Sequence, residues 1–282
     1  MQRTRSFPPL KPLGTAIAVG TFALMQLPAL AQAPAQLAQR SPGVIYVRRE
    51  VSGPAPGGRY RGGGSRSGEQ ALCPVTAVPL TALVPFEEIY RPGREKLPSA
   101  INVWGYTTSD RPTFWVYVPY GNAAIPAKFS IDDEAAGTTI YETTVKLPNQ
   151  PGVIGIPLPK TAPALQLGRR YRWFFSLSCM TPATNSAAID NTYVEAVVIR
   201  ENPKANLASQ LTSSPSLQNA IAYAQAGFWH DALTTLAELR RQRPQDDTLL
   251  TAWKELLSGM STSSAAQQNF NLEQISSQPL VN

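Results

Sequence analysis

The chain has 282 residues, a formal net charge of +6, one histidine and two cysteines. The positive charge is concentrated in one segment, since six arginines lie between residues 40 and 66, whereas the chain from residue 69 onward carries sixteen Lys and Arg against eighteen Asp and Glu. The part of the chain expected to fold therefore has no excess of positive charge that would indicate a nucleic-acid-binding surface. A single histidine and two cysteines also exclude most zinc sites, so we expect no cofactor, no metal and no nucleic-acid partner.

Residues 1–33 have the pattern of a secretory signal peptide. Three cations precede an apolar run over residues 13–27, and small residues follow it, with cleavage expected near Ala31 or Ala33. The apolar run is shorter than the roughly 20 residues that cross a bilayer. We therefore expect an extracytoplasmic protein, periplasmic or secreted, with no transmembrane span in the mature chain.

Residues 34–70 are rich in glycine, proline and arginine and contain few apolar residues. This composition predicts a disordered linker. Its arginines could bind an anionic polysaccharide, and the alternative is a solvated spacer.

Residues 71–201 consist of short runs rich in Val, Ile, Thr and aromatic residues, separated by Gly, Pro, Asn and Asp. Runs of this kind are typical of strands in an all-β domain. We expect strands at 75–84, broken at Pro79, and at 100–106, 113–118, 127–131, 138–147, 152–158, 170–179 and 193–200, with a hairpin loop at 131–138. The sequence therefore predicts an Ig-like antiparallel β-sandwich.

A short motif supports this interpretation. Leu165 and Gly168 precede Tyr171, which opens a strand. The arrangement resembles the tyrosine corner of Ig-like sandwiches, in which the phenol bonds to the backbone of the preceding turn.

The strand at 113–118 has large apolar residues on both faces, since alternation places Trp115 and Tyr117 opposite Phe114. One face belongs to the core. The other either packs under the helical region or is an exposed aromatic platform that binds polysaccharide or a partner. Trp115 and Tyr117 are therefore candidate polysaccharide-binding residues.

The two cysteines, Cys73 and Cys179, are expected to form a disulfide, because an even number of cysteines in an oxidising compartment favours pairing. The alternative is a reactive thiol. No second histidine is present to activate one.

Residues 202–260 show helical periodicity in three stretches. The segment from Gly227 to Pro244 follows the second half of a tetratricopeptide repeat, although the pattern occurs once. We expect a helical hairpin closed by a third helix, with Tyr223, Phe228 and Trp229 as candidate partner-binding residues and His230 exposed in a first helical turn. Residues 261–282 predict a disordered tail.

Five motifs stand out along the mature chain: Cys73-Pro74, residues 79–85 (PLTALVP), 111–120 (RPTFWVYVPY), 170–175 (RYRWFF) and 229–233 (WHDAL). Together they resemble a cyanobacterial family of exported proteins catalogued only as a domain of unknown function. The resemblance spans about Leu72 to Leu257. It implies a two-cysteine exported protein with a β region followed by a helical region, and it implies no activity.

The expected fold class is thus α+β, an Ig-like antiparallel sandwich followed by a small tetratricopeptide-like helical hairpin with a third helix. Both architectures mainly present surfaces. We expect a non-catalytic interaction module of the cell envelope that binds another exported protein through the helical aromatic residues or along a sandwich edge. The alternatives are an envelope polysaccharide-binding protein and an unrecognised hydrolase, for which Glu142 and Glu195 are carboxylates that no motif unites.

Overall fold

The computed structural model describes residues 9, 43–62, 75–93, 98–178, 191–261 and 271–281. Residues 41–282 form one compact unit, which contains every element described below. The predicted signal peptide, apart from Pro9, and both Cys73 and Cys179 lie outside the described residues. The signal peptide, the disulfide and the proposed domain boundaries therefore stay predictions.

The described strands form two sheets. The larger has six strands in the order β2-β3-β9-β8-β5-β6, and the smaller has three in the order β1-β4-β7. The strands are β1 (Thr81–Ala82), β2 (Phe86–Ile89), β3 (Ala100–Thr107), β4 (Thr113–Val118), β5 (Ala127–Asp133), β6 (Thr138–Val145), β7 (Gly152–Pro157), β8 (Arg170–Ser178) and β9 (Asn191–Arg200).

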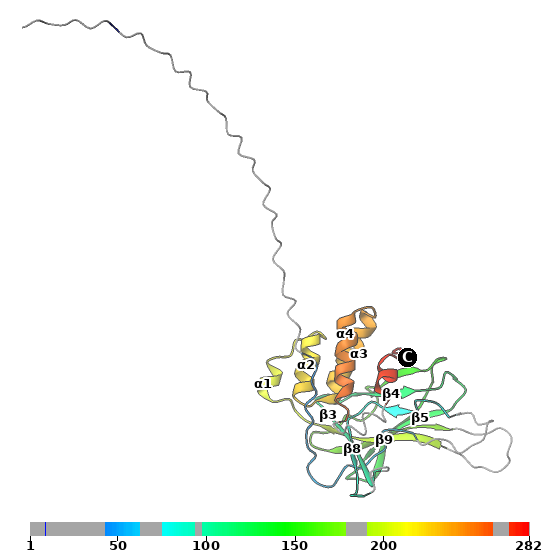
Figure 1. Cartoon of the computed structure of the whole chain (residues 1–282). Coiled ribbons are helices and arrows are strands. Elements are labelled where there is room, and N and C mark those ends of the chain that lie inside the picture. The colour runs from blue at the N-terminus through cyan, green and yellow to red at the C-terminus, as the bar shows by residue number, and fades with distance from the viewer. Residues whose placement is uncertain are drawn as a thin grey trace, which may run out of the picture. The chain divides into compact units, whose positions relative to one another are not determined.

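The helices lie together on one side of the sheets (Figure 1). They are α1 (Ala205–Ala208), α2 (Leu217–Gln225), α3 (Trp229–Gln242), α4 (Asp247–Ser258) and α6 (Leu272–Ser276). Side chains fix two of the starts, because Ser216 caps α2 by accepting from the Asn219 amide and Asp246 caps α4 by accepting from the amides of Thr248 and Leu249. None of the described helices is long and apolar enough to span a bilayer.

The predicted fold class is wrong. The described part of the chain is mainly β, and β3 pairs with β9 in parallel, so the larger sheet is not an antiparallel Ig-like sheet. Helices form near the predicted residues, but their buried apolar side chains belong to core clusters that they share with the strands rather than to a separate tetratricopeptide-like unit. Periodicity identifies the type of an element and carries no information on which strands become neighbours.

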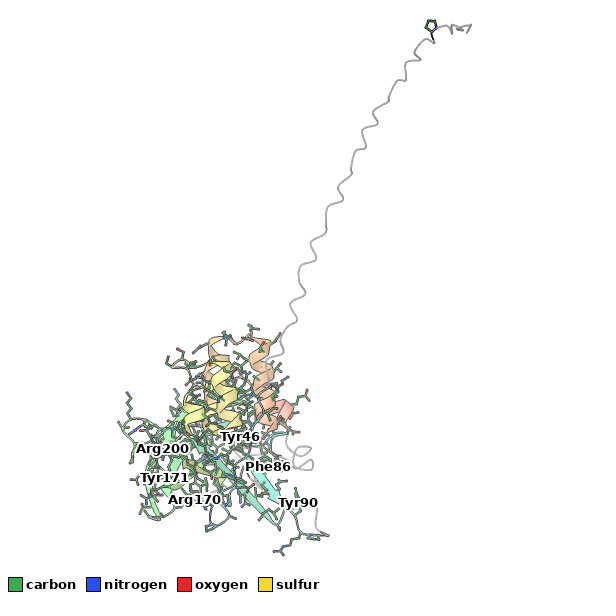
Figure 2. All side chains as sticks on the ribbon, turned by 90° about the vertical axis from the view of Figure 1, so that its left-hand side faces the viewer. Tyr46, Phe86, Tyr90, Arg170, Tyr171 and Arg200 are labelled. Atoms are coloured by element: carbon green, nitrogen blue, oxygen red, sulfur yellow. The ribbon has the colours of Figure 1, made fainter. Side chains whose placement is uncertain are left out.

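Two local predictions are confirmed. β5 and β6 form an antiparallel hairpin, and Gly137 in its loop has a φ of 62°, a conformation that favours glycine. The buried phenol oxygen of Tyr171 accepts a hydrogen bond from the backbone amide of Gln166 at 3.1 Å, as a tyrosine corner requires. Figure 2 shows Tyr171 among the strands, away from the helices.

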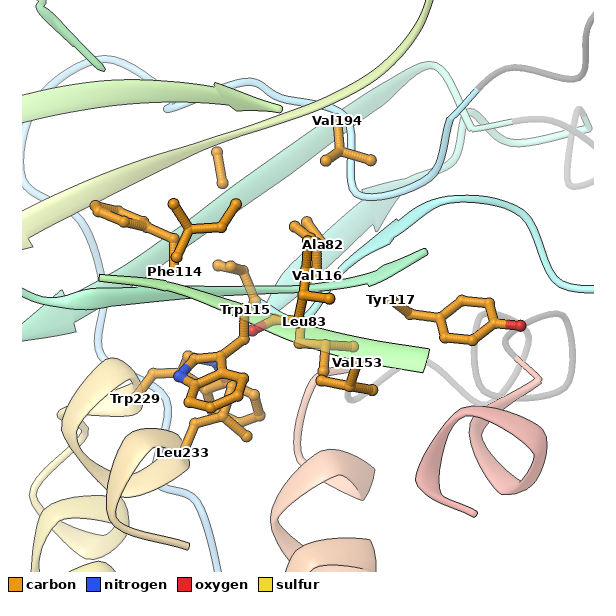
Figure 3. Packing of buried hydrophobic residues seen from close by; sticks show 14 of the residues in the cluster. Ala82, Leu83, Phe114, Trp115, Val116, Tyr117, Val153, Val194, Trp229 and Leu233 are labelled. Atoms are coloured by element: carbon orange, nitrogen blue, oxygen red, sulfur yellow. The ribbon is translucent and has the colours of Figure 1, made fainter. Parts of the chain in front are cut away.

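β4 is the central strand of the smaller sheet and is covered on both faces. Figure 3 shows Phe114 and Trp115 leaving β4 in opposite directions, with Trp115 directed toward the helix α3 that carries Trp229. Phe114 lies between the sheets, with its ring centre 5.3 Å from that of Trp173. The face with Trp115 therefore packs under the helices, one of the two alternatives that the sequence left open.

Residues 43–62, which we call the strap, pack on the fold, whereas the sequence predicts a disordered linker there. Val44, Tyr46 and Tyr60 are buried, and Figure 2 shows Tyr46 at the base of the helices. The Val44 amide donates to a carboxylate oxygen of Glu255 in α4 at 2.9 Å, and the Val47 amide donates to the Ala224 carbonyl at 3.0 Å. Composition did not predict this packing, because the segment contains few apolar residues and its contacts are with residues that are distant in the sequence.

The second half of the strap joins the two sheets. Arg59 forms an isolated antiparallel bridge with Glu195 in β9, and Arg61 forms another with Thr81 in β1. Tyr60 lies between them and stacks on Phe86, with 3.6 Å between ring centroids. The strap thereby connects the larger and smaller sheets with backbone hydrogen bonds.

Candidate functional site

The helical residues predicted to bind a partner are not openly exposed. Phe228 and Trp229 are buried, and Tyr223 is half-buried. The Trp229 indole N–H donates to the Leu83 carbonyl at 2.7 Å, and its ring meets Tyr46 edge to face at 4.8 Å. These aromatic residues hold the helices and the strap onto the sheets, so they do not form an open docking surface.

Trp115 and Tyr117, the predicted polysaccharide-binding residues, are also buried, with 1% and 6% of their surfaces exposed. Trp115 forms part of the lining of a pocket of about 380 Å³ between β4, β7 and α3, and Tyr117 does not. The Trp115 indole N–H donates to the Thr234 hydroxyl at 3.0 Å, and the Arg241 guanidinium lies 5.0 Å from the ring centre. The structure thus places one of the two residues at a cavity, under an arginine.

The arginines of the strap contact the fold itself. Arg48 donates to the carbonyls of Phe86 and Met260, and Arg49 pairs with Glu201 and lies over the Tyr106 ring. Burial lowers the pKa of Arg48. These two cations anchor the strap. Because their guanidinium groups already bind groups of the fold, they are less available to an external polyanion.

A second group of charges surrounds an open pocket of about 780 Å³ at the β5–β6 hairpin. Arg170 and Arg172 both pair with Glu134, at 2.8 and 2.6 Å, and Arg169 pairs with Asp133 at 3.1 Å. Figure 2 shows Arg170 near Tyr171, away from the helices. Each of these arginines has a carboxylate partner, so the cluster fixes the hairpin against β8.

The single histidine, His230, is buried at 1% exposure, so the prediction that it is exposed is wrong. It occupies the space left by Gly105 in β3, where an added Cβ would lie 2.9 Å from the histidine Nε2. Its ring meets Phe114 at 5.6 Å, and burial lowers its pKa to about 4. The ring is therefore neutral at physiological pH and serves the packing of α3 on β3 and β4.

The neighbouring Asp231 connects α3 to the end of β3. Its carboxylate accepts hydrogen bonds from the amide and the hydroxyl of Thr108, at 3.0 and 2.6 Å. Burial raises the pKa of Asp231, and the bonds from Thr108 oppose that shift. Both titratable residues at the start of α3 thus serve its packing on the sheets, and Asp231 does so through hydrogen bonds.

Three of the four edges of the two described sheets are short or covered. β1 has two residues and is bridged by the strap, and β2 has four residues, of which two are glutamates. The edge of β7 is covered by the C-terminal segment, since the Val153 amide donates to the Pro279 carbonyl and the Val281 amide donates back to the Val153 carbonyl, both at 2.9 Å. Short, charged and covered strands are the usual protection against unwanted strand pairing.

The fourth edge, β6, is long and open among the described residues. Its eight residues contain no proline and no glycine, and no described segment bridges its outer side. Its one acidic residue, Glu142, pairs with Lys128 on β5 at 2.7 Å, which offsets the charge that would otherwise repel a partner. A strand of this kind is a template for pairing with another chain.

The hydrogen-bond pattern identifies the backbone groups of β6 that face outward. The Ser178 amide donates to the Pro126 carbonyl and the Glu134 amide donates to the Arg170 carbonyl, so even-numbered residues of β5 face β8. Backbone groups alternate sides along an antiparallel strand, so odd-numbered residues of β5 face β6, where their partners are Tyr141, Thr143 and Val145. The N–H and C=O groups of Glu142 and Thr144 therefore face away from the sheet.

Sequence reasoning predicted the strand and missed the site. The run without proline or glycine at 138–145 is the signal that was available, but the sequence does not show which strand ends a sheet. We call the outward side of β6 the open edge and treat it as the candidate functional site.

No curated protein matches the chain. The family model described as Domain of Unknown Function (DUF928) matches residues 61–270, which span both sheets and helices α1 to α4. The chain therefore belongs to the DUF928 family.

Proposed function

We propose that this protein is a non-catalytic, extracytoplasmic interaction module of the cell envelope, which binds an extended segment of another exported protein along the open edge. The observation that carries the proposal is the contrast between the eight-residue β6, whose outer side no described segment covers, and the short or covered β1, β2 and β7. Strand addition supplies affinity through main-chain hydrogen bonds, which Glu142 and Thr144 offer.

The test uses one position with a matched pair of variants. Proline at 144 removes an outward N–H that makes no bond to β5, and edge strands tolerate proline when the N–H faces solvent. Thr144→Ala removes the side chain and keeps the N–H. The tagged full chain is crosslinked in cells and its partners are identified by mass spectrometry, with thermal unfolding as the check on folding.

A partner that is captured by the wild type and Thr144→Ala, and lost with Thr144→Pro, supports strand addition. In the purified complex, slowed hydrogen exchange at the amides of Glu142 and Thr144 locates the contact. Capture that is equal in all three proteins refutes the role of the open edge.

Export and a cyanobacterial source are part of the same proposal, and they rest on residues 1–33 and on the family resemblance. The disulfide between Cys73 and Cys179 belongs with them. Amino-terminal sequencing of the protein from an envelope fraction tests cleavage near Ala31 or Ala33, and intact mass after alkylation with and without reduction tests the disulfide.

Binding of an envelope polysaccharide is a second candidate function, favoured by the pocket above Trp115. Lys146, Glu238 and Arg241 lie around this pocket, and their side chains can hydrogen-bond the hydroxyl groups of a sugar. Binding of purified envelope polysaccharide that Arg241→Ala and Lys146→Ala both weaken supports it. Binding that is unchanged in both variants rejects it.

A further inference from the structure

We propose that the partner at the open edge is a second copy of this chain, paired β6 to β6 in antiparallel orientation about a two-fold axis at Thr143. This inference rests on the proposed function of the edge and names its occupant. The two larger sheets then form one continuous sheet, in which Tyr141 lies opposite Val145 of the partner subunit.

The hydrogen-bond pattern restricts the possible registers. Outward backbone groups pair with outward groups in an antiparallel ladder, so Glu142 must lie opposite an even-numbered residue of the second copy. The four central choices are residues 140, 142, 144 and 146, of which residue 140 lies at the irregularity where the β5–β6 register shifts and the alternation is interrupted. Every other register places an outward-facing group opposite an inward-facing one.

Chemistry selects among these registers. With residue 142 opposite itself, two glutamates meet, and like charges directly opposite each other are destabilising. With Glu142 opposite Ile140, a charge meets an apolar side chain. With Glu142 opposite Lys146, opposite charges meet, but the pairing runs past the end of β6 toward Pro148, where proline removes a ladder hydrogen bond.

The remaining register places Glu142 opposite Thr144, and each cross-strand pair then occurs twice, once on each side of the two-fold axis. Tyr141 meets Val145 on each side of the axis, and aromatic with β-branched pairs are favourable cross-strand neighbours. Thr143 meets Thr143 of the partner subunit on the axis. The segment from Tyr141 to Val145 is thus complementary to itself, as an isologous two-fold interface requires.

Burial supports the same arrangement. Tyr141 and Val145 are partly buried side chains packed at the rim of the core, on the face of the sheet that carries Phe129 and Ile131 of β5. A second β6 in this register extends that rim with the same two apolar side chains. The ion pair of Glu142 with Lys128 leaves the edge without net charge to oppose a second copy.

The first experiment is a disulfide trap in the full chain. On the axis, Thr143 and its copy form a non-hydrogen-bonded pair with Cα atoms about 4.5 Å apart, which suits a disulfide. The matched control is Thr139→Cys, also on β6, where the two copies lie about 27 Å apart along the strands. We expect Thr143→Cys to give a covalent dimer on a non-reducing gel after mild oxidation, and Thr139→Cys to give none.

The second experiment tests the register by charge. Sedimentation velocity over a concentration series gives the dimer dissociation constant for the wild type, Thr144→Lys and Thr144→Glu. Position 144 lies opposite Glu142 of the partner subunit on both sides of the two-fold axis. Thr144→Lys is therefore expected to lower the dimer dissociation constant and Thr144→Glu to raise it, each by roughly fivefold. Within one chain the signs are reversed, since Thr144 lies beside Lys128, so a change in monomer stability does not produce this result.

The outcomes separate this inference from the proposed function. A wild type that stays monomeric at all concentrations, or equal trapping at positions 139 and 143, overturns the second copy. If capture of a different protein is then still lost with Thr144→Pro, the open edge keeps its proposed function with another occupant. If neither capture nor self-association responds to Thr144→Pro, both proposals fall.

Discussion

Acidification is expected to destabilise the fold through His230. Both ring nitrogens are buried without a hydrogen bond of normal geometry to a described residue, and burial outweighs the opposing effect of the Thr113 backbone on the pKa. Burial lowers the pKa of His230 from 6.5 to about 4 in the folded chain. The unfolded state therefore binds a proton first as the pH falls, so the stability present above pH 6.5 is lost toward pH 4.

The size of this effect follows from the two pKa values. A difference of 6.5 against about 4 corresponds to a limiting loss of about 3.4 kcal/mol, of which about 1.3 kcal/mol disappears between pH 7.5 and 5.5. The raised pKa of Asp231 acts in the opposite direction, so the effect of His230 is measured as the difference from a variant that keeps Asp231 and lacks the histidine. The chain has one histidine, so no other histidine contributes.

The assay is urea unfolding followed by tryptophan fluorescence at pH 7.5, 6.5 and 5.5. The control is His230→Leu, which replaces the imidazole with an apolar side chain of similar size that does not titrate. The wild type should lose stability as the pH falls and the variant should not. Equal slopes in the two proteins, or a wild type with a constant free energy of unfolding, would refute the argument from burial.

Three further substitutions follow from the packing. Gly105→Ala places a Cβ 2.9 Å from the His230 ring and should cost about 1–3 kcal/mol, measured by urea unfolding; an unchanged midpoint would contradict this. Trp229→Phe keeps an aromatic ring but leaves the buried Leu83 carbonyl without its indole donor, for a loss of about 1–3 kcal/mol, and a melting temperature equal to that of the wild type would count against it. Removing residues 279–282 uncovers the edge of β7, and we expect faster proteolysis there and lower solubility; a truncated chain that resists proteases as well as the full chain would show that this cover is dispensable.

Much of the secondary structure could be predicted from the sequence, because alternation and helical spacing are local. The segment 113–118 was predicted at its observed bounds, and the corner at Tyr171 followed from three residues of one turn. The short strand at Phe86–Ile89 was missed, since its two central glutamates break the apolar pattern.

The pairing of the strands and the burial of His230 could not be predicted, because both depend on distant residues. His230 is buried since Gly105, far away in sequence, leaves room for its ring. The strap was missed for the same reason, as Arg48 is held by the carbonyls of Phe86 and Met260. The open edge is a property of the sheet order, and the composition of β6 alone does not reveal it.

The strap also determines when the fold can close during synthesis. The Val44 amide bonds to Glu255 and Arg48 bonds to the Met260 carbonyl, across separations of 211 and 212 residues. Contacts of such high sequence separation form slowly, and a nascent chain that ends before α4 offers neither acceptor. Most of the polypeptide is therefore made before the strap can bond to α4 and Met260, so these contacts complete the fold only after residue 260 has been synthesised.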